Sequence, residues 1–183
     1  MRPKIVAQSR GNTICFAALL LAVPMAGIAD TQTTTQTLAA SISPAGKLSV
    51  PANVTLTNST TRFGDFSGSL SVSYWARTSA AGAGSVTVQA GSAFSPPTGP
   101  AVTQVTYICG GATLGTGCSG TQTIQTATQT PVVTIPGSVC TGGGGSCSST
   151  VPNTVQMQFK LANKPSFETG AYSMQLTFTV STL

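Results

Sequence analysis

The final part of the chain shows the clearest pattern of hydrophobic and polar positions. Between residues 172 and 180, large apolar residues occupy every second position, and Ser, Gln or Thr stand between them. Successive side chains of a β-strand point to opposite faces, so this pattern predicts a strand with one buried and one wet face. The apolar set is Tyr172, Met174, Leu176, Phe178 and Val180.

The same two-residue period recurs along most of the chain, separated by turn signals such as Pro44-Ala45-Gly46. A further apolar set lies between residues 48 and 56, where Pro51 predicts a bulge or an edge strand. No segment has helical periodicity. We therefore expect an all-β chain, a single immunoglobulin-like or jelly-roll-like β-sandwich of about eight strands. The other predicted strands cover residues 38–42, 68–77, 86–90, 102–108, 121–135 (broken at Pro131) and 153–162.

The first 29 residues are typical of a secretory signal peptide. Basic residues precede the apolar run 14–23, and Gly27-Ile28-Ala29 offers small residues for cleavage. A membrane anchor is the alternative, but it needs about 20 apolar residues. We expect a secreted or cell-surface protein with no membrane span after signal removal, consisting of a signal peptide (1–29), a polar tail (30–37) and a β-sandwich domain (38–183).

The net charge belongs largely to this leader. The whole chain carries a formal charge of +5. Removing Arg2, Lys4 and Arg10 leaves five basic against three acidic residues, a charge of +2. The five are scattered, which disfavours nucleic-acid binding. A weakly charged surface rich in Thr, Ser, Gln and Gly suits a protein that packs against copies of itself.

Four cysteines remain after the leader: Cys109, Cys118, Cys140 and Cys147. An even number in a secreted chain predicts two disulfides, for which three connectivities are possible. We favour Cys109–Cys118 and Cys140–Cys147, because each pair brackets a Gly-rich loop. A zinc site is the rival interpretation, but structural zinc sites use more closely spaced cysteine pairs.

The sequence lacks the usual parts of a catalytic site. It contains no histidine, which removes histidine-based nucleophilic catalysis and histidine metal ligands. After the leader its side-chain carboxylates are Asp30, Asp65 and Glu168, and nothing in the sequence brings two of them together as a glycosidase needs. The glycine run at residues 142–145 has no following Lys-Ser/Thr, so nucleotide binding is not indicated. We expect a non-enzymatic protein without a cofactor.

Two features admit both a structural and a functional interpretation. Trp75 stands on the serine side of its predicted strand, where it either packs under a neighbouring strand or binds a sugar or a partner. Asn53 and Asn58 begin N-glycosylation sequons, which matter only in a eukaryotic secretory pathway.

The C-terminal pattern resembles that of a known class of surface proteins. Gly170-Ala171-Tyr172, followed by the alternating residues up to the end, is similar to the last strand of chaperone–usher pilins and of spore-coat-U-type secreted domains. Phe63-Gly64-Asp65-Phe66 resembles the Phe-Gly-x-aromatic element of the second group. The resemblance implies an incomplete sandwich that is completed by a strand from a neighbour, with copies of itself or a periplasmic chaperone as partners.

Three functions follow as hypotheses. The first is a structural fimbrial, fibre or matrix subunit that assembles by β-strand addition. The second is a secreted carbohydrate- or protein-binding module that uses Trp75. The third, a hydrolase, requires Asp65 and Glu168 to meet in one pocket.

Overall fold

A computed structural model describes residues 36–58, 62–79, 81–137 and 147–183. The predicted signal peptide and residues 30–35 of the predicted tail lie outside the described residues. Residues 40–183 belong to one compact unit. This unit consists of two antiparallel β-sheets, which confirms the predicted all-β sandwich.

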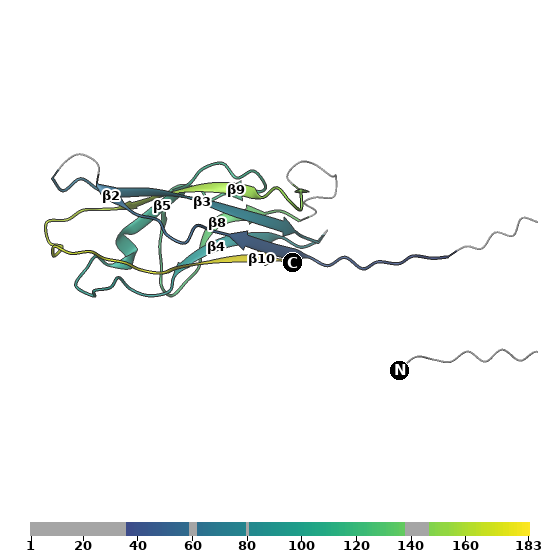
Figure 1. The fold of residues 1–183 in the computed structure, drawn as a ribbon, viewed down its shortest axis with the longest axis horizontal. Helices are drawn as coiled ribbons and strands as arrows, with labels where there is room; N and C mark the ends of the chain where they lie inside the picture. Colours follow the sequence, from purple (N-terminus) through teal and green to yellow (C-terminus); the bar gives the residue numbers. More distant parts are fainter. Residues whose placement is uncertain (1–35, 59–61, 80, 138–146) are drawn as a thin grey trace, which may run out of the picture. The chain divides into compact units, whose positions relative to one another are not determined.

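The two sheets form layers that enclose the core (Figure 1). Sheet A has the strand order β1-β3-β9-β5-β7, and β2 also pairs with β3. Its strands are β1 (Ala45–Ser49), β2 (Thr57–Asn58), β3 (Phe66–Arg77), β5 (Val105–Cys109), β7 (Gln122–Thr123) and β9 (Asn153–Leu161). Sheet B has the order β10-β4-β8-β6. Its strands are β4 (Gly84–Ala90), β6 (Thr116–Gly117), β8 (Thr130–Ile135) and β10 (Leu176–Thr182), and a short 3-10 helix, η1 (Val102–Gln104), precedes β5.

The core follows the alternation read from the sequence. In β4 and β9 every second residue is buried, from Gly84 to Ala90 and from Asn153 to Leu161. Met157 of β9 is fully buried and lies opposite Leu70 of β3. Burying such side chains stabilises the fold by about 1.5–3 kcal/mol each.

Several predicted strands differ from those in the structure, and residues 102–104 of the strand predicted over 102–108 form η1 instead. Residues 38–42 are not a strand, and β1 begins at Ala45, inside the predicted turn. Leu38 and Ile42 are 97% and 74% exposed, so their alternation has no core to face within the described chain. The predicted strand 121–135 is two strands, since β7 belongs to sheet A and β8 to sheet B.

Two buried tyrosines connect distant parts of the sandwich. The Tyr107 hydroxyl, from sheet A, lies 2.7 Å from the carbonyl oxygen of Pro131 in sheet B. The Tyr74 hydroxyl donates a hydrogen bond to the carbonyl oxygen of Leu114. Burial raises the pKa of both hydroxyls above their ordinary value.

These tyrosines should make the fold sensitive to alkali. Because their folded-state pKa values are raised, their contribution is complete below the unfolded value of about 10 and is lost as pH rises through the folded values. We expect the free energy of unfolding, measured with urea, to fall above about pH 10. Replacing both Tyr74 and Tyr107 by Phe should flatten this fall. An equally steep fall in the double variant would contradict this assignment.

Candidate functional site

The core-facing residues of the C-terminal segment are only partly covered. Met174, Leu176, Phe178 and Val180 are half-buried, although they pack against the core. The equivalent positions of β9, in the middle of sheet A, are buried. Within the described chain, this part of the core is therefore less covered than the centre of sheet A.

The strand predicted over residues 172–180 begins later than expected. β10 starts at Leu176, and residues 172–175 precede it. This preceding segment is nevertheless tied to the loop after β4, because Ser173 and Ser95 exchange two backbone hydrogen bonds of 2.8 and 3.0 Å. Its opposite side has no partner strand among the described residues.

A second half-covered apolar segment connects β1 and β2. Both strands pair with the same edge of β3, with Ser49 opposite Ser73 and Thr57 opposite Ser67. Between these pairs, seven residues (50–56) face five (68–72), so the chain bulges away from the sheet. The strand predicted over residues 48–56 is therefore not continuous, and Pro51 lies in the unpaired stretch between β1 and β2 at the edge of sheet A. The half-buried apolar residues of this segment are Leu48, Val50, Val54 and Leu56.

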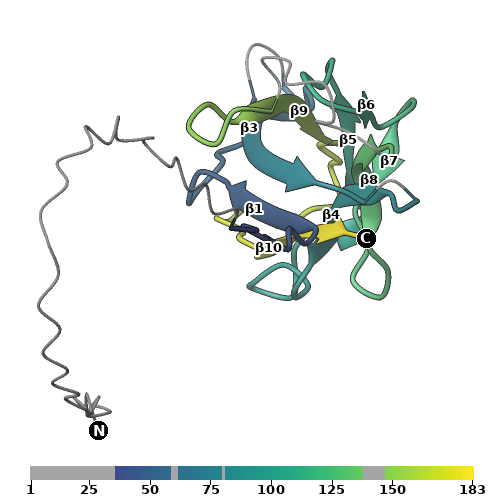
Figure 2. The same cartoon turned by 90° about the vertical axis from the view of Figure 1, so that its right-hand side faces the viewer.

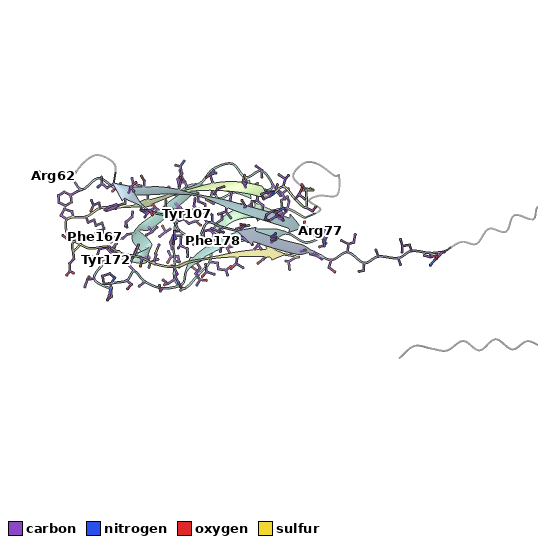
Figure 3. The ribbon with its side chains drawn as sticks, in the orientation of Figure 1. Arg62, Arg77, Tyr107, Phe167, Tyr172 and Phe178 are labelled. Carbon is purple, nitrogen blue, oxygen red and sulfur yellow. A yellow bond between two sulfur atoms is a disulfide. The ribbon has the colours of Figure 1, made fainter. Side chains whose placement is uncertain are left out.

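These two segments form the walls of a groove of about 1240 Å³, which we call the edge groove. Figure 3 labels Phe167, Tyr172 and Phe178 along one wall. Core residues such as Leu70 and Phe159 form its floor. The walls are residues 48–56 on one side and residues 167–178 on the other.

The edge groove closes where the two sheets meet. β1 and β10 lie side by side (Figure 2). A Cβ atom placed on Gly46 would lie 3.0 Å from a methyl group of Val180. There is no room for another strand at this point, so the accessible part of the groove begins beyond it, near Leu48 and Phe178.

Both sheets end at this groove with unpaired edges. In the described chain β10 pairs only with β4, and β1 pairs only with β3. The opposite edges are β6 and β7, which are two residues long. Short edge strands resist pairing with another chain, whereas long free edges invite it. The longer of the edge strands therefore lie on the groove side.

The disulfide Cys109–Cys118 holds the opposite side of the sandwich. It joins the end of β5 in sheet A to the residue after β6 in sheet B. This confirms one of the two predicted pairings. Cys147 is also disulfide-bonded, and Cys140, its predicted partner, lies outside the described residues.

Removal of this bridge should weaken the fold. Its sequence separation is nine residues, and a loop of this size is worth about 2.5 kcal/mol in the chain-entropy model. The double variant Cys109→Ala/Cys118→Ala should lose about that much free energy of unfolding, measured with urea under oxidising conditions. An unchanged unfolding midpoint would show that the bridge does not stabilise the domain.

Among the other residues selected from the sequence, Asn53, Phe63 and Glu168 also line the groove, whereas Trp75 and Asp65 do not. Trp75 is half-buried opposite Lys47, whose ammonium group lies 4.7 Å from the centroid of the ring. A cation of the chain itself therefore covers one face of the Trp75 ring. The Asp65 carboxylate lies 2.7 Å from the Lys160 ammonium group, and this hydrogen bond lowers the pKa of the Asp65 carboxyl.

The described residues contain no group of three His, Cys, Asp or Glu side chains that could hold a metal ion. Their helical content includes nothing long and apolar enough to cross a membrane. No family model matches the chain, and no curated protein matches its sequence.

The sequence pattern indicated a functional role for the groove wall at residues 167–178. It did not indicate one for the wall at residues 48–56. The alternation from Tyr172 to Val180 marked the C-terminal wall. The second wall was visible only as an apolar set interrupted by Pro51. That interruption was the available signal, because a proline in an apolar run marks a strand edge.

Proposed function

We propose that the protein is a non-enzymatic structural subunit of a secreted or cell-surface fibre or matrix, which assembles by β-strand addition. The edge groove is the observation that supports this function. It combines an apolar floor, two half-buried walls and two unpaired sheet edges. An added strand would bury the apolar surface and satisfy backbone groups at the same time.

The occupant that fits the groove best is residues 36–44 of a second copy. Leu38, Ala40 and Ile42 share one parity of this segment, and the two large residues are 97% and 74% exposed. Extended, the segment spans about 30 Å. Placed in the groove, it would turn Leu38 and Ile42 towards the floor and Ala39 and Ser41 towards water.

Burial of the two large side chains offsets only part of the cost of ordering this segment. Burying Leu38 and Ile42 would each contribute about 1.5–3 kcal/mol. The half-buried residues Leu176 and Phe178 would gain further cover from the same strand. Ordering the segment costs about 1–2 kcal/mol per residue, so backbone hydrogen bonds along both walls are needed as well. A periplasmic chaperone that supplies a strand to the groove before assembly is the heterologous partner of the same kind.

A concentration series of the mature chain, residues 30–183, tests this function. Size-exclusion chromatography and negative-stain microscopy should show a ladder of oligomers or filaments that grows with concentration. The oxidised protein should be used, because the disulfides belong to the fold. A single monomer peak throughout, together with no binding of a synthetic peptide of residues 36–44, would contradict assembly through the groove.

A further inference from the structure

The outer face of sheet A carries a second, polar hollow of about 580 Å³, which we call the outer hollow. Ser67 and Ser69 of β3 lie opposite Lys160 and Gln158 of β9. Ile108 of β5 lies on the other side of Gln158. Three neighbouring strands therefore present their outward-facing residues to one hollow.

Half of the polar side chains that line the outer hollow have no hydrogen-bond partner among the described residues. Four side chains that line it make no side-chain hydrogen bond within the part of the chain that the structure describes. Three are hydroxyls, and the fourth is an amide, so all can donate and accept. These residues are Ser67, Ser69, Thr121 and Gln158.

The side chains that line the outer hollow carry no net charge. Its charged groups, Asp65 and Lys160, form an ion pair at 2.7 Å. Each charge therefore compensates the other, and the hollow offers no free charge to an ionic ligand. The Ile108 side chain, 44% exposed, adds an apolar contact beside the hydroxyls and the amide.

We propose that the outer hollow binds a neutral saccharide. Sugar hydroxyls both donate and accept hydrogen bonds, as do the four uncommitted side chains. The C–H face of a sugar ring is apolar and suits Ile108. The volume lies within the range of about 300–1,000 Å³ that is usual for small-ligand sites.

This site is distinct from the edge groove, although Phe159 lines both, and Trp75 lines neither of them. Ser69 and Lys160 have the opposite parity to Leu70 and Leu161, which line the groove. Because alternate residues of a strand point to opposite faces, the two sites lie on opposite faces of sheet A. Saccharide binding and strand addition can therefore be tested independently.

The test is titration of the full mature chain with neutral cello-, chito- and manno-oligosaccharides, followed by isothermal calorimetry and saturation-transfer NMR. We expect at least one series to bind. Gln158→Ala and Ser69→Ala should each weaken binding about tenfold, which corresponds to about 1.4 kcal/mol. Ser73→Ala is the matched control, because it removes a hydroxyl from the same face of β3 outside the hollow.

The outcomes separate clearly. Binding that is lost in Gln158→Ala, kept in Ser73→Ala and unchanged by 0.5 M salt supports the proposal, since salt screens only charged contacts. Absence of binding to every neutral series, equal affinity in Gln158→Ala, or binding that disappears in salt would overturn it. Circular dichroism and the thermal midpoint of each variant verify that it is folded. Oligomer formation should be unchanged in Gln158→Ala, so that loss of saccharide binding is distinguishable from loss of the proposed assembly.

Discussion

Deletion of residues 36–42 is expected to abolish oligomer formation and to leave a folded monomer. The segment contributes no strand to either sheet, and its two large side chains are exposed. Its removal should therefore leave the core unchanged. In the proposed assembly the same residues supply the strand that fills the edge groove of the next copy.

Point variants make this test more specific. Leu38→Asp and Ile42→Asp should prevent oligomers, because each would place a carboxylate against the apolar floor. Burying an unpaired carboxylate costs several kcal/mol, so association should weaken by a factor of about 100 or more. Ala39→Asp and Ser41→Asp are the matched controls, since their parity faces water in the same pairing.

The measurement is the oligomer distribution by mass photometry and negative-stain microscopy at equal concentrations. Loss of oligomers in the Leu38 and Ile42 variants, with retention in the controls, supports the register proposed here. If all four variants assemble like the parent chain, residues 36–42 are not the added strand. If all four fail equally, charge in general, and not parity, controls the association.

The second large effect is that truncating a core side chain should destabilise the monomer more than truncating a side chain at the groove. Met157 is fully buried in the centre of sheet A, so Met157→Ala should lower the free energy of unfolding by about 2–5 kcal/mol. Leu176 is half-buried at the groove. In the monomer Leu176→Ala should cost only about 1 kcal/mol, because part of the side chain already contacts water.

Assembly should make Leu176→Ala more destabilising than it is in the monomer. When a strand fills the groove, Leu176 becomes covered, and its truncation should then weaken association as well as the fold. Urea unfolding of the monomeric deletion variant and thermal unfolding of the oligomer measure the two states. As a surface control, Val151→Ala should change neither, because Val151 is 61% exposed and lies outside the groove. Equal losses for Leu176→Ala in both states would argue against a strand in the groove.

The sequence by itself determined the fold class and much of the strand content. Strict alternation at residues 68–77 and 153–162 identified β3 and β9, because a half-buried strand imposes a period of two. The short loop between Cys109 and Cys118 also favoured the bridge that the structure contains. Pro51 marked an edge, since proline cannot donate a backbone hydrogen bond to a neighbour.

Only the tertiary structure decided which apolar patterns become buried strands. Leu38 and Ile42 alternate as well as the core strands do, yet they lie exposed, because burial depends on a neighbour that local sequence does not specify. The assignment of β7 and β8 to different sheets depends in the same way on long-range pairing. The edge groove arises because residues 50–56 bulge from β3 while β10 remains at an edge, two segments more than a hundred residues apart that meet only in the folded chain.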